Sequence, residues 1–208
     1  MTTFSKTVII LSVIKGIFVV SLILSMMLWS IPILSFNSRI WLLFQERSGV
    51  LLNDGDVRTY NDLIVDFFRN GLKLEFLNEK EFSHMEDVRQ IILIANILFA
   101  FSFITLVSEF SYLSRSQKRF LLEATRRISI SVFVISLILS AFILVNFQTA
   151  FLSFHKIFFV RNFIFPLNSL LKTLYPDEFF FGLSALYLLS VMVVSLAIAI
   201  VSHKLKLK

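Results

Sequence analysis

The stretch Ile128–Phe147 reads ISISVFVISLILSAFILVNF and contains no charged side chain. A helix rises about 1.5 Å per residue, so about 20 apolar residues cross the hydrocarbon core of a bilayer. Three further apolar runs of similar length lie at Thr7–Ile31, Ile91–Leu113 and Leu183–Val201. The sequence therefore predicts four membrane-spanning helices.

The composition of the chain agrees with this prediction. Of its 208 residues, 57% are apolar and 16% are charged, whereas soluble domains contain about 45–50% and about 25%. Cysteine is absent, which excludes disulfides, thiolate metal sites and a cysteine nucleophile. The three histidines are then the only side chains that normally titrate near neutral pH.

Charge is distributed unevenly along the chain. The N-terminus, the loop 114–127 and the C-terminal tail together carry +8, whereas segments 33–90 and 149–182 carry −3 and +1. Lys and Arg are enriched in cytoplasmic loops, so we expect both termini and loop 114–127 in the cytoplasm and the two longer segments outside. The net charge of +6 is thus a topology signal, and no nucleic-acid partner is expected.

Two charges fall within the predicted spans. Lys15 and Glu109 lie in the cytoplasmic halves of antiparallel neighbours and could form an ion pair, because intramembrane charges usually find a partner. Alternatively, Lys15 extends to the membrane surface and Glu109 lies at the interface.

The predicted architecture is an all-α membrane protein, a four-helix transmembrane bundle with a small extracytoplasmic α/β cap made from the two outer loops. The cap is expected to contain a hairpin (Arg39–Gln45 with Val50–Leu52), an amphipathic helix (Thr59–Asn70) ended by Gly71, and a short strand (Leu72–Phe76). In chain order, the parts are the N-terminus with the first span (1–32), the cap loop (33–90), the second span (91–113), the basic loop (114–127), the third span (128–148), the aromatic loop (149–182), and the fourth span with the tail (183–208).

The two outward segments each carry one histidine beside a span. Ser83-His84-Met85-Glu86 has the form of a capping box, which predicts that a helix begins at Ser83 with His84 in its first turn. The helix dipole disfavours a charged imidazole there, whereas Asp87 on the same face favours one. His155 follows the third span, so topology places it at the same interface.

The segment 149–182 is rich in aromatic residues, with nine phenylalanines, and sets His155 and Lys156 among them. Such a segment either lines a groove for an acyl chain or forms an interfacial aromatic belt that only anchors the protein. Two imidazoles at one membrane surface suit general acid–base catalysis at neutral pH, although each alone also has a purely structural explanation. His203 lies among tail lysines and is given no role.

Glu81-x-x-His84-Met85-x-Asp87-Val88, Phe154-His155-x-x-Phe158-Phe159 and Leu174-Tyr175-Pro176-x-x-Phe179, together with four spans, resemble the lipoprotein intramolecular transacylase (Lit) family of Gram-positive bacterial membrane proteins. Phe163 and Asn168 depart from the tryptophan and the acid that typical members are expected to have.

The resemblance implies an acyltransferase of the bacterial cell membrane. Its substrate is a lipoprotein with a diacylglyceryl thioether on its N-terminal cysteine, and it moves the sn-2 acyl chain to the cysteine α-amine. Ester becomes amide, so no ATP, metal or other cofactor is required. The active site is expected at the outer leaflet, among membrane lipids.

In this reaction His84 is expected to be the base and His155 the acid or relay partner, although the roles could be reversed. Asp87 is expected to orient His84. The remaining expected residues are oxyanion-stabilising cations (Lys156, Arg161 or Arg89) and acyl-chain contacts (Phe154, Phe158 and Phe159). The competing hypotheses are a non-enzymatic lipid-binding or accessory membrane protein and, third, a haem or metal protein.

Overall fold

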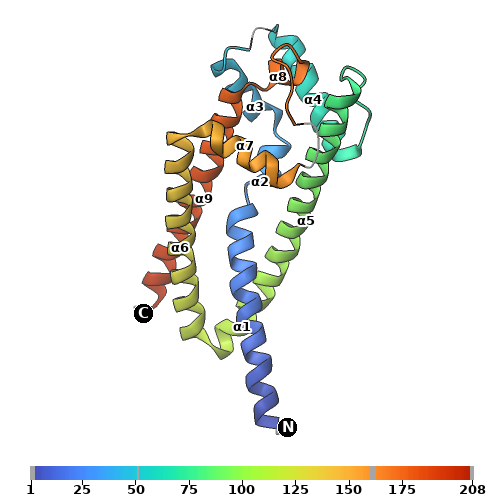
Figure 1. Cartoon of the computed structure of the whole chain (residues 1–208). Helices are drawn as coiled ribbons and strands as arrows, with labels where there is room; N and C mark the ends of the chain where they lie inside the picture. Colours follow the sequence, from blue (N-terminus) through green and yellow to red (C-terminus); the bar gives the residue numbers. More distant parts are fainter. Residues whose placement is uncertain (1–2, 51, 160–162, 207–208) are drawn as a thin grey trace. The chain divides into compact units, whose positions relative to one another are not determined.

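The computed structural model describes residues 3–50, 52–159 and 163–206, and every regular element in this part of the chain is an α-helix (Figure 1). The helices are α1 (Thr3–Leu28), α2 (Ile31–Ser35), α3 (Ser38–Arg47), α4 (Asp54–Asn70), α5 (Glu79–Ser116), α6 (Lys118–Val145), α7 (Phe147–Phe158), α8 (Leu170–Leu174) and α9 (Asp177–Lys206). The prediction of an α/β cap is therefore wrong, since no strand occurs among the described residues and both outer segments are helical.

Four helical segments are long and apolar enough to cross a membrane, as predicted. They are Val8–Ser35, α5, α6 and α9. Three of them continue beyond the apolar runs: α5 has 38 residues, because its first turns carry the charged residues that precede Ile91.

The chain divides into two compact units. Unit 1 comprises residues 1–29, 96–137 and 189–208, and unit 2 comprises residues 30–95 and 138–188. Unit 1 contains most of the apolar helical residues, and unit 2 contains both outer segments with the adjoining helix ends.

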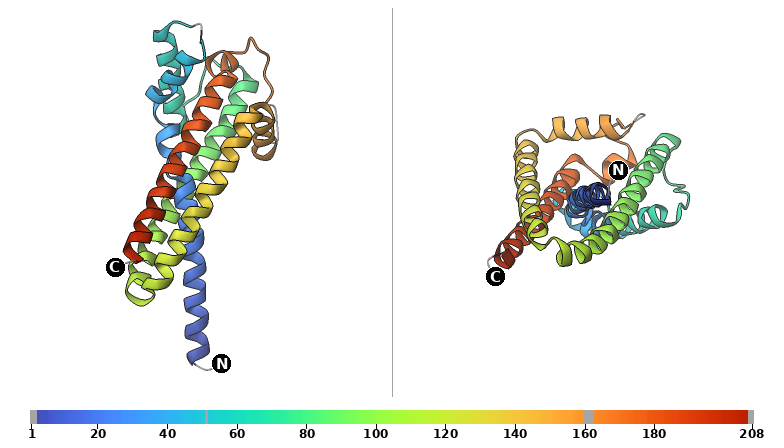
Figure 2. Two further views of the ribbon diagram at one scale, coloured as in Figure 1. Left: turned by 90° about the vertical axis from the view of Figure 1, so that its left-hand side faces the viewer. Right: turned by 90° about the horizontal axis from the view of Figure 1, so that it is seen from below.

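Small polar side chains and aromatic contacts hold unit 1 together. Ser25 on α1 donates to Ser102 on α5 (3.2 Å), and Ser129 on α6 contacts the Met26 sulfur (3.6 Å). Small residues of this kind let membrane helices approach closely. Figure 2 shows the end of α9 beside the α5–α6 turn, where Lys206 donates to Glu123 on α6 (2.8 Å).

The two charges within the spans do not pair. Lys15 Nζ lies 4.7 Å from the centroid of the Phe120 ring, a cation–π contact. Glu109 is buried, and its Oε2 has no hydrogen-bond partner among the described residues. The ion pair considered from the sequence is therefore absent from this part of the chain.

The first arm of the expected hairpin, Arg39–Gln45, is helical and lies within α3. In the second arm, Val50–Leu52, Leu51 lies outside the described residues. The Asn37 side chain accepts from the backbone N–H groups of Arg39 and Ile40, so it caps a helix at the point where the hairpin was to begin. Trp41, Leu42 and Gln45 then share the buried face. The apolar residues of this stretch thus belong to a helix, whose start is fixed by the Asn37 cap.

The amphipathic helix of the first outer segment is confirmed as α4. It begins at Asp54, five residues before the expected start, and ends at Gly71, whose φ of 75° is the left-handed conformation that glycine adopts most readily. The stretch expected as a strand instead forms an irregular connection that buries Leu74 and Leu77.

Helix α5 begins four residues before the predicted Ser83 cap. Asn78 Oδ1 accepts from the Glu81 backbone N–H (3.0 Å), and Glu81 Oε2 accepts from the Asn78 backbone N–H (3.2 Å), which makes a reciprocal capping box. Glu81 is also buried and accepts from the backbone N–H of Leu171 at the start of α8 (3.2 Å). This tertiary bond favours the earlier start, and it places His84 beyond the first turn.

A second buried polar network joins the two outer segments within unit 2. Asn61 on α4 is fully buried and accepts from the Gln45 side chain (3.2 Å) and from the Tyr175 hydroxyl (2.8 Å). Gln45 also donates to the backbone carbonyl of Leu174 (2.9 Å). Burial raises the pKa of Tyr175, so its hydroxyl stays protonated and able to donate.

Replacing Asn61 by alanine should destabilise the protein by about 3 kcal/mol, because it leaves buried polar groups of Gln45 and Tyr175 without partners. The measurement is unfolding of the purified protein in one detergent, followed by tryptophan fluorescence. The matched control is Asn53→Ala, at an exposed position whose side chain makes no cap hydrogen bond. Equal losses in the two variants would contradict the role given to the network.

Two helix glycines should respond to alanine in opposite directions. A Cβ on Gly182 of α9 would overlap the Phe44 ring of α3, whereas a Cβ on Gly16 of α1 meets nothing within 4 Å. Gly182→Ala should therefore lower stability by about 1–3 kcal/mol. Gly16→Ala should raise it by up to about 1 kcal/mol through helix propensity. The same unfolding measurement checks both, and a stabilising Gly182→Ala would refute the close approach.

Candidate functional site

The structure brings together the two histidines that the sequence analysis singled out. The rings of His84 on α5 and His155 on α7 stack with centroids 6.1 Å apart and planes 20° apart. Both residues belong to unit 2. The pair is therefore a feature of one compact unit and combines residues from both outer segments.

Helix α7 holds His155 in a defined orientation. Asn146 begins this helix by accepting from the Thr149 backbone N–H (3.1 Å). The imidazole is 7% exposed, and its Nδ1 lies 2.8 Å from the Phe151 carbonyl oxygen. A carbonyl can only accept, so the contact requires the neutral ring to carry its proton on Nδ1 and leaves the Nε2 lone pair as the basic site.

The surroundings of His155 favour its neutral form. Burial is the main cause that lowers the pKa of His155, and the charge of Lys172 acts in the same direction. The hydrogen bond to Phe151 and the charge of Asp177 act against this decrease. His155 is thus a neutral base with a fixed tautomer.

His84 also lies among aromatic rings. Its ring centroid is 4.7 Å from that of Phe159 and 5.3 Å from that of Phe165. Its Nδ1 is buried and has no hydrogen-bond partner in the part of the chain that is described. Asp87 is close enough to act on it electrostatically, but no hydrogen bond between them is present among the described contacts. The free Nδ1 leaves His84 with hydrogen-bonding capacity for another molecule.

Lys80 holds the segment around Phe165 beside His84. Its Nζ donates to the Ile164 carbonyl oxygen (3.0 Å) and lies 5.5 Å from the Phe165 ring centroid. The neighbouring Phe163 ring lies 5.5 Å from that of His155. One connecting segment therefore places an aromatic ring against each imidazole.

The three phenylalanines predicted to contact acyl chains differ in their exposure. Phe159 is buried and touches both imidazoles, with its centroid 5.2 Å from that of His155. Phe154 and Phe158 are 47% and 50% exposed, and their rings pack against each other at 4.7 Å. Phe159 thus belongs to the wall of the histidine pair, whereas the other two form an apolar surface next to it.

The predicted cations differ in their surroundings. Arg89 Nε donates to the Phe67 carbonyl oxygen (2.9 Å) at the end of α4, and its guanidinium packs beside Gly71. Arg89 therefore caps α4, and its geometry does not support oxyanion stabilisation. Lys156 is exposed, and Arg161 lies outside the described residues.

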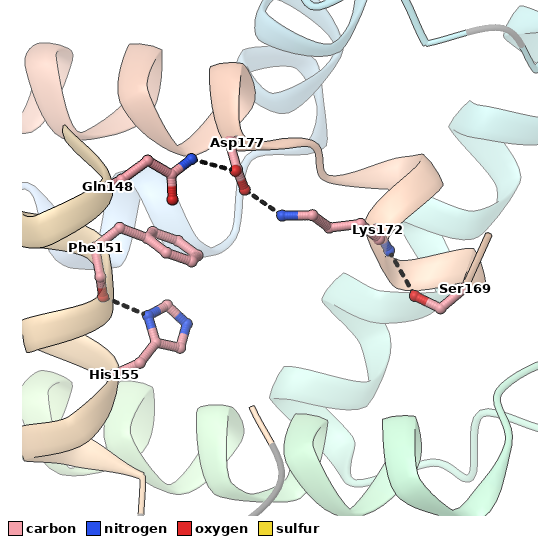
Figure 3. A network of polar contacts seen from close by, with 6 residues as sticks. All are labelled: Gln148, Phe151, His155, Ser169, Lys172 and Asp177. Atoms are coloured by element: carbon pink, nitrogen blue, oxygen red, sulfur yellow. Dashed lines mark hydrogen bonds and ion pairs between the residues drawn. The ribbon is translucent and has the colours of Figure 1, made fainter. Parts of the chain in front are cut away.

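The sequence analysis missed a polar network next to His155 (Figure 3). Gln148 on α7 donates to Asp177 Oδ2 (2.6 Å), and Lys172 on α8 forms an ion pair with the same carboxylate. Asp177 directly follows Pro176, and a proline followed by an acid does indicate a helix start. No sequence signal marked Lys172. Among the described residues, no group of three His, Cys, Asp or Glu side chains has the geometry of a metal site.

Comparisons with known proteins identify a family and structures of similar fold. The family model described as "Lipoprotein intramolecular transacylase Lit" matches residues 8–180. The solved structure of the membrane-integral transacylase Lit from Bacillus cereus superposes with a TM-score of 0.78 at 16% identity, over 94% of this chain and 93% of that one.

Two structures of Bacillus cereus variants, each with one histidine replaced, also match. The arginine variant gives a TM-score of 0.74 at 16% identity, over 93% of this chain and 91% of that one. The alanine variant gives 0.75 at 15% identity, over 98% and 96%. No match was found among curated proteins. Since the family model covers most of the sequence, the chain belongs to the Lit family of lipoprotein intramolecular transacylases, which are membrane-integral acyltransferases.

Proposed function

We propose that the protein moves the sn-2 acyl chain of a diacylglyceryl-cysteine lipoprotein to the α-amine of the same cysteine. The family identifies an intramolecular transacylase acting on lipoproteins. The observation that carries the proposal is the stacked histidine pair, in which buried His155 has a fixed tautomer that leaves the lone pair on Nε2. A transfer within one molecule needs little besides positioning and proton transfer, which such a pair can supply.

His155 acts as the base. Its Nε2 takes a proton from the cysteine α-amine as the nitrogen attacks the ester carbonyl carbon and a C–N bond forms. The tetrahedral intermediate collapses, the bond from the carbonyl carbon to the glycerol oxygen breaks, and the imidazolium returns the proton to that oxygen. The products are an amide on the cysteine and a free sn-2 hydroxyl, so no cofactor takes part.

His84 acts as a neutral hydrogen-bond donor to the carbonyl oxygen, where negative charge develops in the transition state. The sequence favours His84 as the base only if a helix begins at Ser83 and holds His84 in its first turn. Helix α5 begins at Glu79, so His84 lies beyond the first turn and this reason no longer applies. Asp87 supports the orientation of His84. Lys156 and Arg161 remain candidates for further oxyanion stabilisation, and Phe154, Phe158 and Phe159 for contact with the acyl chains.

The reaction takes place at the outer leaflet. Helix α5 is continuous from Glu79 to Ser116 and carries His84 near one end and Arg115 at the other. These residues are separated by about 45 Å of helical rise, more than the ~30 Å hydrocarbon core. With the basic ends of the helices in the cytoplasm, the histidines face the exterior, where lipoproteins are anchored.

Replacing either His84 or His155 by alanine should lower the transacylation rate by a factor of about 100 or more, because each removes a group that acts on the reacting atoms. Mass spectrometry of the N-terminal lipopeptide, from cells that lack any other such activity, measures the product. His203→Ala in the tail is the matched control. Unchanged product from either site variant, at equal protein levels, would overturn the proposed roles.

The protonation of His155 gives an independent check. Because burial lowers its pKa, the ring should remain neutral as the pH falls through about 6.5, the value of a solvated imidazole. Nitrogen-15 NMR of histidine-labelled protein in nanodiscs, assigned with a His155→Gln variant, should also place the proton on Nδ1. Protonation at or above that pH, or a proton on Nε2, would contradict the assignment of His155 as the base.

A further inference from the structure

Asp177 joins three helices around the face of α7 that carries His155. It is the first residue of α9, it accepts from Gln148 on α7 (2.6 Å), and it pairs with Lys172 on α8 (Figure 3). The Lys172 backbone N–H in turn bonds the Ser169 hydroxyl (3.2 Å), which caps α8. Both partners of the ion pair therefore lie in the first turn of a helix, Lys172 in α8 and Asp177 in α9.

The network and His155 share one side of α7. Gln148, Phe151 and His155 follow one another at intervals of three and four residues, so they lie on the same helical face. The Phe151 ring lies 4.1 Å from the His155 ring, and Lys172 Nζ lies 5.9 Å from the Phe151 centroid. Phe151 thus contacts both the imidazole and the ammonium, and the described contacts include no hydrogen bond between the ion pair and the imidazole.

The surroundings strengthen this interaction. The Lys172 and Asp177 side chains are each 25% exposed, so water screens their charges less than at an open surface. The ionisable groups that act on His155 are His84 on α5, Lys172 on α8 and Asp177 on α9. During the proposed reaction His155 becomes positively charged, which Asp177 favours and Lys172 opposes.

We propose that Lys172 and Asp177 are positioning residues of the transacylation site. Held together by their ion pair, they fix α7 through Gln148 and balance the charge around His155, so that the imidazole is neither too readily protonated at rest nor too weak a base. This inference rests on the proposed function, because it assigns the pair a role in the same reaction.

The test is the pH dependence of transacylation in proteoliposomes with a synthetic diacylglyceryl lipopeptide. Lys172→Met removes a positive charge, so the acid side of the rate profile should move to higher pH by about half a unit or more. Asp177→Asn removes a negative charge and should move it to lower pH. The double variant should return the acid side toward the wild-type position.

Variants that keep the charge, and one variant at a distant lysine, distinguish an effect of charge from a general loss of folded structure. Lys172→Arg and Asp177→Glu should retain the wild-type profile, and Lys73→Met, at an exposed lysine elsewhere in unit 2, should leave both rate and profile unchanged. The substrate amine must also lose a proton before it attacks, so it adds a second rise in rate near its own pKa of about 8, identical in every variant.

The outcomes distinguish the two proposals. If the wild-type protein forms no transacylated product, the proposed function itself fails. If the wild-type protein is active but Lys172→Met and Asp177→Asn shift the acid side in the same direction, or only lower the rate uniformly, the positioning role is overturned.

Discussion

The structure of unit 2 depends on buried hydrogen bonds between two segments that are distant in the sequence. His84 and His155 are 71 residues apart and belong to different outer segments. The Glu81 carboxylate caps the start of α5 and also accepts from the start of α8. A carboxylate without these partners would be costly to bury, so the two helix starts remain together. His84 follows Glu81 by three residues, and this junction therefore helps to set its position.

Aromatic side chains surround the His155 imidazole. Phe151, Phe159 and Phe163 lie within 5.5 Å of the His155 ring, centroid to centroid. They bury the imidazole, and burial disfavours its charged form. Charged groups are placed at the edge of this environment, where the Lys172–Asp177 pair can act on the imidazole without contacting it.

Features that depend on local sequence were predicted well. The four spans followed from apolar length alone, and the end of α4 followed from Gly71, since few other residues adopt its left-handed backbone readily. Helix starts were predicted less well, because two candidate caps competed before α5. Asn78 and Ser83 both precede a glutamate by three residues, and only the bond from Glu81 to Leu171 in another segment distinguishes them.

By itself, the sequence determined that the chain spans a membrane, and its cysteine-free composition directed attention to two outward histidines as proton carriers. Apolar length, charge bias and residue chemistry are local properties, so they can be read without coordinates. Only the tertiary structure decided that Arg89 caps a helix, that Lys172 stands near His155, and that Nδ1 of His155 faces a carbonyl. Each of these depends on which distant groups meet when the apolar surfaces are buried, and a single sequence does not encode that choice in any short stretch.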